Sequence, residues 1–290
     1  GKNLDTAEKE LFFSLSKAYD MYNYLLLLMV EITKQAEKKL NAAKSKLLPT
    51  AEELYPNTKF VDNKFIGILE NDTAFHALCK KKGLLWGEYD SFIKKLFASI
   101  ITKEYYNAYM ESPERSLKED AEFIKKIYEE ELEDNEVLED ILEEMSLYWM
   151  DDLSYVVNVI LKNIPAIARK GVVEVPKTFL KEDDREYALK LLTKSIINYD
   201  EYTELVSSMV SNWDLERLVA TDLALIVMGV TEAVTFESIP LKVTINEFVD
   251  ISKYYSTPNS KVFVNGLLDR ILQQMLKEGK IVKSGRGLVG

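Results

Sequence analysis

One apolar stripe near the start of the sequence restricts the fold more than any other feature. Apolar residues recur there at alternating spacings of four and three, at Leu11, Leu15, Ala18, Tyr22, Leu25, Met29 and Ile32. This spacing puts them on one face of an α-helix, where they form a seam for a second helix. The pattern predicts one long helix that ends near Lys46, before Pro49.

The remainder of the sequence is also helical in pattern, and no strand periodicity is evident. Only 11 glycines and 7 prolines occur in 290 residues, and 29% of the residues are charged. That balance favours helices over turn-rich β-sandwiches. We therefore expect an all-α protein.

Gly171 and Pro176 interrupt the helical pattern and mark a candidate domain boundary. Shorter helices are predicted before it, near 64–70, 72–80, 88–111 and 117–145, and then on to residue 170. Further helices are predicted after it, at 183–197, 199–211, 215–235, 241–255 and 258–276. The expected organisation is a helical N-terminal region (1–176), a helical domain (177–276) and a basic flexible tail (277–290).

The net charge of −11 is concentrated in one segment. Residues 114–152 contain 16 acidic and 4 basic residues, a net charge of −12, and the rest of the chain is close to neutral at +1. We expect a solvated acidic face, with Ile124, Ile127, Val137, Ile141 and Met145 buried beneath it. Because the acidity is local, it does not exclude a nucleic acid partner elsewhere.

No recognisable catalytic or cofactor motif is present. One histidine, His76, is too few for a histidine metal site, and no glycine-rich phosphate loop occurs. Cys79 precedes Lys80, Lys81 and Lys82, which could lower its pKa, but no nucleophile motif surrounds it. We therefore expect no enzyme, no metal and no cofactor.

The dipeptide Asn265-Gly266 is typical of a β-hairpin turn, yet it lies within a helical pattern. Phe263, Leu267, Ile271 and Met275 recur at a spacing of four. This register predicts that Gly266 lies beside the buried face and lets a neighbouring helix approach closely, while Asn265 bonds to a neighbouring backbone. On the preceding helix, the expected buried face comprises Val243, Phe248, Ile251 and Tyr255, with Asn246 and Glu247 as buried polar residues.

The C-terminal third resembles the NusB family of bacterial transcription antitermination factors. The matching positions extend from about residue 177 to residue 275: Trp213, Arg217, Leu218, Asp222, Glu232, Ile239, Pro240, Val243, Ile245, Asn246, Glu247, Ser260, Phe263, Val264, Asn265, Gly266, Leu268 and Asp269. The 1–176 segment is similar to the extended form of Bacteroidetes-type lineages. The resemblance implies a NusB-like helical bundle after a long N-terminal helical extension, in a cytoplasmic protein without a membrane span.

The resemblance also implies a function and partners. Proteins of this family bind boxA RNA together with the NusE ribosomal protein, within the RNA polymerase antitermination complex, and promote read-through, notably of ribosomal RNA operons. Carried over to this sequence, Asp222 falls on a partner-facing position. Tyr255, Asn259, Ser260 and Phe263 fall at the RNA-contacting loop and helix start.

The chemistry of these residues is compatible with RNA. Exposed aromatic rings at Tyr255 and Phe263 would stack on unpaired bases, although Phe263 fits a buried core position equally well. Lys253 and Lys261 would neutralise phosphates. Asn259 stands where the family commonly has an acidic residue, and the loss of that charge favours RNA.

The family usually begins with an arginine-rich helix, and residues 1–40 contain no arginine. Because the chain starts with Gly1, we expect native upstream residues to be missing. A hypothetical substitute for that helix is the basic tail, with Lys277, Lys280, Lys283 and Arg286. An alternative function is a non-enzymatic scaffold whose acidic face binds a basic protein without RNA. NusB-like domains also precede some RNA methyltransferases, but neither a cofactor loop nor a catalytic cysteine motif is found here.

Overall fold

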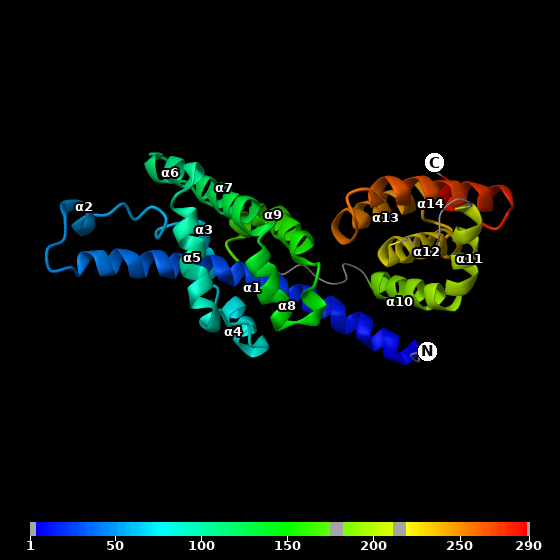
Figure 1. The fold of residues 1–290 in the computed structure, drawn as a ribbon, viewed down its shortest axis with the longest axis horizontal. Coiled ribbons are helices and arrows are strands. Elements are labelled where there is room, and N and C mark those ends of the chain that lie inside the picture. The colour runs from blue at the N-terminus through cyan, green and yellow to red at the C-terminus, as the bar shows by residue number, and fades with distance from the viewer. Residues whose placement is uncertain (1–3, 175–181, 211–218, 289–290) are drawn as a thin grey trace. The chain divides into compact units, whose positions relative to one another are not determined.

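The computed structural model describes residues 4–174, 182–210 and 219–288, and every regular element in these ranges is a helix. The prediction of an all-α chain is therefore confirmed. The chain divides into two compact units, each shown in Figure 1. Residues 13–177 form the N-terminal unit, and residues 178–290 together with residues 1–12 form the C-terminal unit.

The N-terminal unit is built from nine α-helices and three short turns of other helix types among the described residues. The α-helices are α1 (Leu4–Lys44, whose first residues belong to the C-terminal unit), α2 (Ala51–Leu54), α3 (Lys64–Asn71), α4 (Thr73–Lys82), α5 (Asp90–Ile100), α6 (Glu104–Glu111), α7 (Leu117–Ile127), α8 (Glu136–Met145) and α9 (Leu153–Lys170). The short turns are η1 (Gly87–Tyr89), η2 (Tyr128–Leu132) and η3 (Leu147–Trp149). The helix predicted over 88–111 is interrupted near Thr102, whose hydroxyl donates a hydrogen bond back to the Ser99 carbonyl (2.7 Å).

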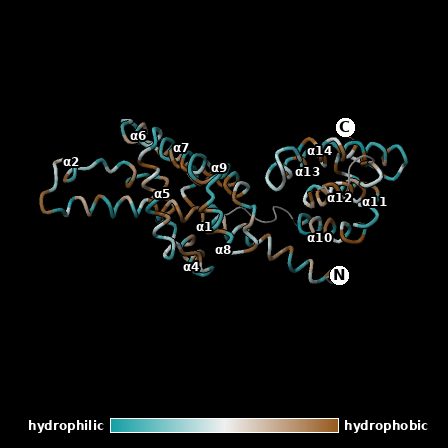
Figure 2. Tube along the Cα trace, in the orientation of Figure 1, coloured by the Kyte–Doolittle hydropathy of each residue, from teal (hydrophilic) through white to brown (hydrophobic). Residues whose placement is uncertain are grey.

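The middle of α1 is the centre of the N-terminal unit. The predicted long helix is present, and Leu25, Met29 and Ile32 are buried, but every residue from Asp20 to Val30 is buried as well. A helix that is apolar on all sides belongs in a core, and Figure 2 shows this hydrophobic stretch in brown. α1 is therefore surrounded by other helices here and does not present a single seam.

Aromatic side chains fix α1 in this position. The Trp86 indole N–H donates to the Tyr24 carbonyl (3.0 Å), and the buried Tyr128 hydroxyl donates to the Leu25 carbonyl (2.9 Å). The Tyr24 and Trp86 rings also stack, with centroids 4.0 Å apart. These contacts give each buried polar group on the rings a partner, as burial requires.

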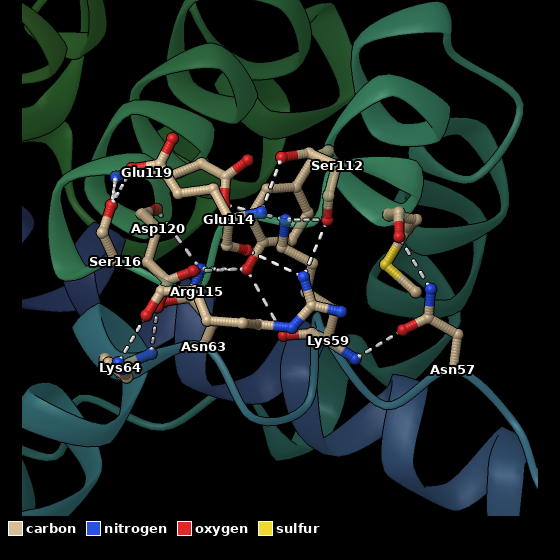
Figure 3. Close-up of polar contacts among 12 residues, drawn as sticks. Asn57, Lys59, Asn63, Lys64, Ser112, Glu114, Arg115, Ser116, Glu119 and Asp120 are labelled. Carbon is tan, nitrogen blue, oxygen red and sulfur yellow. Dashed lines mark hydrogen bonds and ion pairs between the residues drawn. The ribbon is translucent and has the colours of Figure 1, made fainter.

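A buried polar network joins the loop before α3 to α6 and α7 (Figure 3). The Lys59 side chain is 1% exposed, and its ammonium lies 2.8 Å from a Glu119 carboxylate oxygen, 3.0 Å from the Ser112 carbonyl and 4.4 Å from the centre of the Tyr109 ring. The Tyr109 hydroxyl in turn donates to Asp120 (2.7 Å). A buried charge is tolerated only when it is paired in this way.

The acidic segment forms a largely solvated face, as predicted. Beneath it Ile124, Ile127 and Ile141 are buried and Met145 is half-buried, but Val137 is 57% exposed, so its predicted burial is wrong. Asp120 is buried as well, in the polar network around Lys59 and Tyr109. Glu131 is buried instead of solvated, and its carboxylate accepts hydrogen bonds from the hydroxyls of Ser99 (3.0 Å) and Tyr105 (3.1 Å).

The C-terminal unit has α12 at its centre. Its described helices are α10 (Glu182–Ile197), α11 (Tyr199–Met209), α12 (Ala220–Thr235), α13 (Leu241–Tyr255), α14 (Ser260–Lys277) and η5 (Gly285–Leu288). α12 contacts α10, α11, α13 and α14, which explains why it is apolar almost throughout. The proposed boundary at 176–177, and residues 211 and 215–218 of two predicted helices, lie outside the described residues.

The glycine that permits close helix packing is Gly229, and the prediction for Gly266 is wrong. A Cβ atom built on Gly229 of α12 would lie 2.8 Å from Leu268 Cδ2 on α14. A Cβ atom on Gly266 would meet nothing within 4 Å, and Asn265 and Gly266 are both exposed. Of the predicted buried face of α14, Leu267, Ile271 and Met275 are buried and Phe263 is half-buried. The face also includes Val264, Leu268 and Leu272, which the predicted spacing of four did not contain.

Because Gly229 is closely packed and Gly266 is not, substitutions at the two positions should have opposite effects on stability. Gly229→Val should lower the free energy of unfolding by about 2 kcal/mol, because the added methyl groups crowd a packed helix crossing. Gly266→Ala should raise it by about 0.5–1 kcal/mol, because alanine is the better helix former and the space is open. Urea unfolding followed by circular dichroism measures both. If both variants changed the free energy of unfolding in the same direction, Gly229 would not be the packing glycine that distinguishes itself from Gly266.

The register of α13 also differs from the predicted one. Val243 and Ile251 are 43% and 38% exposed, and the buried face comprises Thr244, Ile245, Phe248 and Ser252. Asn246 and Glu247, predicted to be buried, are exposed. A polar residue in an apolar segment is not always buried, because each residue turns the helix by about 100° and a step of two residues reaches the opposite side.

No helix in the described ranges is long and apolar enough to cross a membrane.

Candidate nucleic-acid interface

The predicted RNA-binding residues lie on and beside the loop that joins α13 to α14. α13 ends at Tyr255 and is followed by Ser256, and α14 starts at Ser260 after Asn259. The intervening sequence, Ser256-Thr257-Pro258-Asn259, is rich in residues that favour turns and helix starts. Local sequence therefore determines where both helices stop and start.

The carboxylate of Asp222 fixes this loop in place by accepting hydrogen bonds from it. Asp222 lies in the first turn of α12 and is only 4% exposed. One of its oxygens accepts a hydrogen bond from the Ser256 hydroxyl (2.6 Å), and the other accepts one from the Ser260 hydroxyl (2.8 Å). A carboxylate is stabilised at a helix N-terminus by the backbone dipole, so this position suits a buried negative charge.

The hydroxyls are also connected to one another. Ser260 Oγ lies 2.9 Å from Ser256 Oγ and 2.8 Å from Thr257 Oγ1, and the Ser260 amide donates to the Thr257 carbonyl (2.9 Å). We call Asp222, Ser256, Thr257 and Ser260 the loop clamp. Sequence analysis missed Ser256 and Thr257, although their place next to a proline was a usable signal for a hydroxyl-stabilised turn.

The loop clamp changes how two predicted contact residues are interpreted. Asp222 and Ser260 are 4% and 2% exposed, and their polar atoms are engaged within the chain. Direct contact of either side chain with a partner stays a prediction. The structure supports a positioning role for Asp222 and Ser260, because both residues fix the backbone of the loop.

The rim of the loop is exposed and carries the predicted cations. Lys253, Asn259 and Lys261 are all exposed. Lys253 pairs with Asp250 (2.5 Å), and hydrogen bonding to that carboxylate raises the pKa of the lysine, which therefore stays protonated. Its positive charge is partly offset by Asp250, so Lys261 is the less compensated cation of the two.

The two predicted aromatic residues, Tyr255 and Phe263, are half-buried. Phe263 packs against the core of the C-terminal unit, yet part of its ring remains accessible. The position of Phe263 is therefore compatible with both hypotheses, a core residue and a surface on which a base stacks. Half-buried rings beside exposed lysines are the usual composition of single-strand binding surfaces.

The chain end is docked, which differs from the predicted flexible tail. Ile281 is buried, the Lys283 ammonium donates to the Phe236 carbonyl (3.0 Å), and the Ser284 amide donates to the Glu237 carbonyl (3.1 Å). Burial lowers the pKa of Lys283. Lys280 is paired with Glu278 (2.8 Å). Two of the four cations in the hypothetical RNA-binding tail are thus already engaged.

The single cysteine, Cys79, lies on α4 of the N-terminal unit. Cys79 is 2% exposed, and burial raises the pKa of its thiol to about 11, so the neighbouring lysines do not activate it. Among the described residues no group of three or more histidine, cysteine, aspartate and glutamate side chains could hold a metal ion.

Comparison with known proteins places the loop clamp and its rim within a recognised domain. The NusB family model matches residues 167–273. The transcription antitermination protein NusB of Salinibacter ruber is 38% identical over 125 residues, which are 42% of this chain and 76% of that protein. The chain belongs to the NusB family.

Two further NusB proteins match the chain at lower identity. That of Chloroherpeton thalassium is 32% identical over 129 residues, 42% of this chain and 61% of its own length. That of Natranaerobius thermophilus is 25% identical over 115 residues, 40% of this chain and 83% of its own. No solved structure gives a significant match.

The matched region contains all of the residues that carry the family resemblance. α12, α13 and most of α14 lie within it, and so do the loop clamp and its rim. Trp213, Arg217 and Leu218, which also belong to the resemblance, lie outside the described residues. Most of the N-terminal unit lies outside the family match.

Proposed function

We propose that this protein acts in transcription antitermination by binding boxA-type RNA together with the NusE ribosomal protein, notably in ribosomal RNA operons. The observation that carries the proposal is the match to NusB proteins over the region that contains the α13–α14 loop. In this proposal the chain is a non-enzymatic component of an RNA polymerase antitermination complex.

The proposed RNA contact surface is the rim of the loop. Lys253 and Lys261 would meet phosphates, the rings of Tyr255 and Phe263 would stack on unpaired bases, and Asn259 would hydrogen-bond to a base edge. Asp222 and Ser260, which are buried, would keep the loop backbone in position. This division of roles follows from burial, since Asp222 and Ser260 are buried whereas the rim side chains reach solvent.

Salt dependence tests the role of the two lysines. In a titration of boxA RNA with this chain and the NusE protein, Lys253→Ser/Lys261→Ser should weaken binding and reduce the slope of log K against log salt by about 1.4, roughly 0.7 for each lost phosphate contact with a single strand. Lys194→Ser, at an exposed position of α10, serves as the control and should leave the slope unchanged.

Two results would contradict this proposal. If the control and the double variant behaved alike, the loop rim would not be the contact surface. If the unaltered chain bound neither boxA RNA nor NusE, the family relationship would describe the fold alone.

The acidic face supports a second candidate, a scaffold that binds a basic protein without RNA. On α8 and the turn after it, Val137 and Leu147 are 57% and 80% exposed among exposed carboxylates. These side chains would give a basic partner apolar contact area beside the carboxylates. Salt-sensitive binding of a basic protein, with no RNA retained, would favour this function.

A further inference from the structure

A partly apolar pocket in the N-terminal unit is lined by α5, η1, η2 and the start of α8. Its volume is about 430 Å³, and the apolar part of its wall comes from Tyr89, Phe92, Leu96 and Val137. Phe92 and Leu96 belong to the core of the unit, whereas Val137 is 57% exposed. Apolar surface therefore extends from inside the pocket to the solvent.

The polar wall of the pocket includes a buried carboxylate, Glu131, whose side chain is 5% exposed. Glu131 lies in η2, a π-helical turn, and such turns are rare and occur frequently at functional sites. Its oxygens accept hydrogen bonds from the uncharged hydroxyls of Ser99 and Tyr105. The Lys103 ammonium, on a 42% exposed side chain, lies 3.5 Å away, farther than the about 2.7–2.9 Å of a strong charge-assisted hydrogen bond. Glu131 therefore makes the pocket wall negative.

Further carboxylates lie around the pocket. Glu88 lines it, and burial together with the charges of Glu144 and Glu88 raises the pKa of the Tyr89 hydroxyl, which places both carboxylates near that ring. The described lining residues include two carboxylates, Glu88 and Glu131, and one cation, Lys95. The pocket itself is thus weakly negative, and Glu144 adds to that charge from outside the lining.

The negative charge continues from the pocket along α8. Val137, Asp140 and Glu144 recur at spacings of three and four, so they share one face of this helix, and both carboxylates are exposed. Residues 129–144 contain ten acidic residues and no basic one. A ligand that occupies the pocket beside Val137 would therefore also lie against an acidic helix face.

The charge of this surface determines the class of its occupant. Nucleic acids are polyanions and many membrane surfaces are anionic, so both would be repelled. A polypeptide rich in lysine and arginine would be attracted, because complementary charges favour association. The apolar wall adds a second requirement, since a purely polar basic segment would make no use of Phe92 and Val137. An amphipathic basic helix, with apolar side chains on one face and cations beside them, meets both requirements.

We propose that this pocket and the adjacent face of α8 bind a basic amphipathic helix of a protein partner. Apolar side chains of that helix enter the pocket against Phe92 and Val137, and its lysine or arginine side chains pair with Asp140 and Glu144. The site lies in the part of the N-terminal unit that the family match does not cover. The inference therefore goes beyond the RNA binding proposed for the α13–α14 loop and does not depend on it.

The test uses the full chain and a synthetic probe, a fluorescein-labelled peptide of about 18 residues with leucine on one helical face and arginine on the other. Fluorescence anisotropy should show saturable binding of this peptide, and a peptide with glutamate in place of arginine should not bind. Val137→Lys should weaken binding about tenfold, because it puts a cation at the apolar edge of the pocket. Val172→Lys adds the same charge at a 49% exposed position that does not line the pocket, and should stay within about twofold.

A second pair of variants tests the acidic face of α8. Glu144→Gln, on the same side of the helix as Val137, should weaken binding about fourfold and reduce its salt dependence. Glu139→Gln removes the same charge from another side of the helix, two residues or about 200° from Val137, and should change binding less than about twofold. All four substituted positions are exposed, and melting curves establish that the variants fold.

The outcomes distinguish this proposal from the proposed function. If Val137→Lys bound the arginine peptide as tightly as Val172→Lys, the pocket would not be the site. If the glutamate peptide bound as well as the arginine peptide, or if the unaltered chain bound neither, the proposal would be wrong. A chain that bound the arginine peptide but not boxA RNA would contradict the proposed function alone.

Discussion

Replacing Lys59 by methionine is expected to lower the free energy of unfolding of the N-terminal unit by about 3–5 kcal/mol. The reason is that the Lys59 side chain is 1% exposed and neutralises Glu119 at 2.8 Å in an environment with little water. Methionine fills a similar volume but leaves the carboxylate and the Ser112 carbonyl without their cation. Removal of one partner from a buried pair costs far more than the pair contributes as a whole.

Exposed ion pairs in the same unit provide the matched control. Lys94 and Asp90 approach to 2.6 Å, but their side chains are 57% and 49% exposed, so Lys94→Met should cost no more than about 0.5 kcal/mol. Calorimetry of both variants gives the comparison, and the Lys59→Met/Glu119→Leu double variant should recover much of the loss. A cost below about 1 kcal/mol for Lys59→Met would show that water reaches Glu119.

The pH dependence of the same variant provides an independent check. Burial acts to raise the pKa of Glu119, but hydrogen bonds from Lys59 and Ser112 outweigh it, and the pKa is lowered. A lowered carboxylate pKa stabilises the fold at pH values above the unfolded pKa, and this stabilisation is lost as the pH falls through the folded value. Acid should therefore destabilise the unaltered chain more steeply than Lys59→Met.

The bounds of α13 were predictable because strong local signals mark both of its ends. The predicted helix 241–255 coincides with α13, since Pro240 precedes its start and Ser256-Thr257-Pro258 follows its end. The predicted helix 183–197 differs from α10 by one residue. In contrast, the break between α5 and α6 has neither glycine nor proline, and depends on a threonine hydroxyl that bonds to the backbone.

The faces of these helices were less predictable than their ends. Asn246, Glu247 and Gly266 all lie in apolar segments, yet they point to solvent, because a shift of one residue rotates a helical position by about 100°. A single sequence shows which residues are apolar but not which neighbour covers them. Gly229 and Gly266 illustrate this limit, since both occur inside apolar helices and only the three-dimensional packing distinguishes them.

Most of the residues predicted for the candidate site lie together at the α13–α14 loop, but the contacts among them were not predictable. The family resemblance pointed to the α13–α14 loop through residues adjacent in sequence, such as Asn259 and Ser260. The pairing of Asp222 with Ser256 and Ser260 joins positions 34 and 38 residues apart. Neither helical periodicity nor a local motif reports a contact over that separation. The sequence therefore predicted that Asp222 faces a partner but did not predict that it fixes the loop.

Asp222→Ala is expected to lower the free energy of unfolding of the C-terminal unit by about 2–4 kcal/mol. Hydrogen bonds to charged groups contribute about 1.5–3 kcal/mol each, and both oxygens of this 4% exposed carboxylate accept one. Asp269→Ala, on the exposed side of α14, is the control and should change stability by no more than about 0.5 kcal/mol.

A double-mutant cycle between Asp222→Ala and Ser260→Ala separates the loop clamp from general damage to the core. If the two residues act through one another, the double variant should cost at least about 1 kcal/mol less than the sum of the single variants. Strict additivity would contradict the clamp. Because neither variant alters a rim side chain, a parallel loss of RNA affinity would follow from the loosened loop alone, which is the behaviour expected of residues that position a binding surface without touching the ligand.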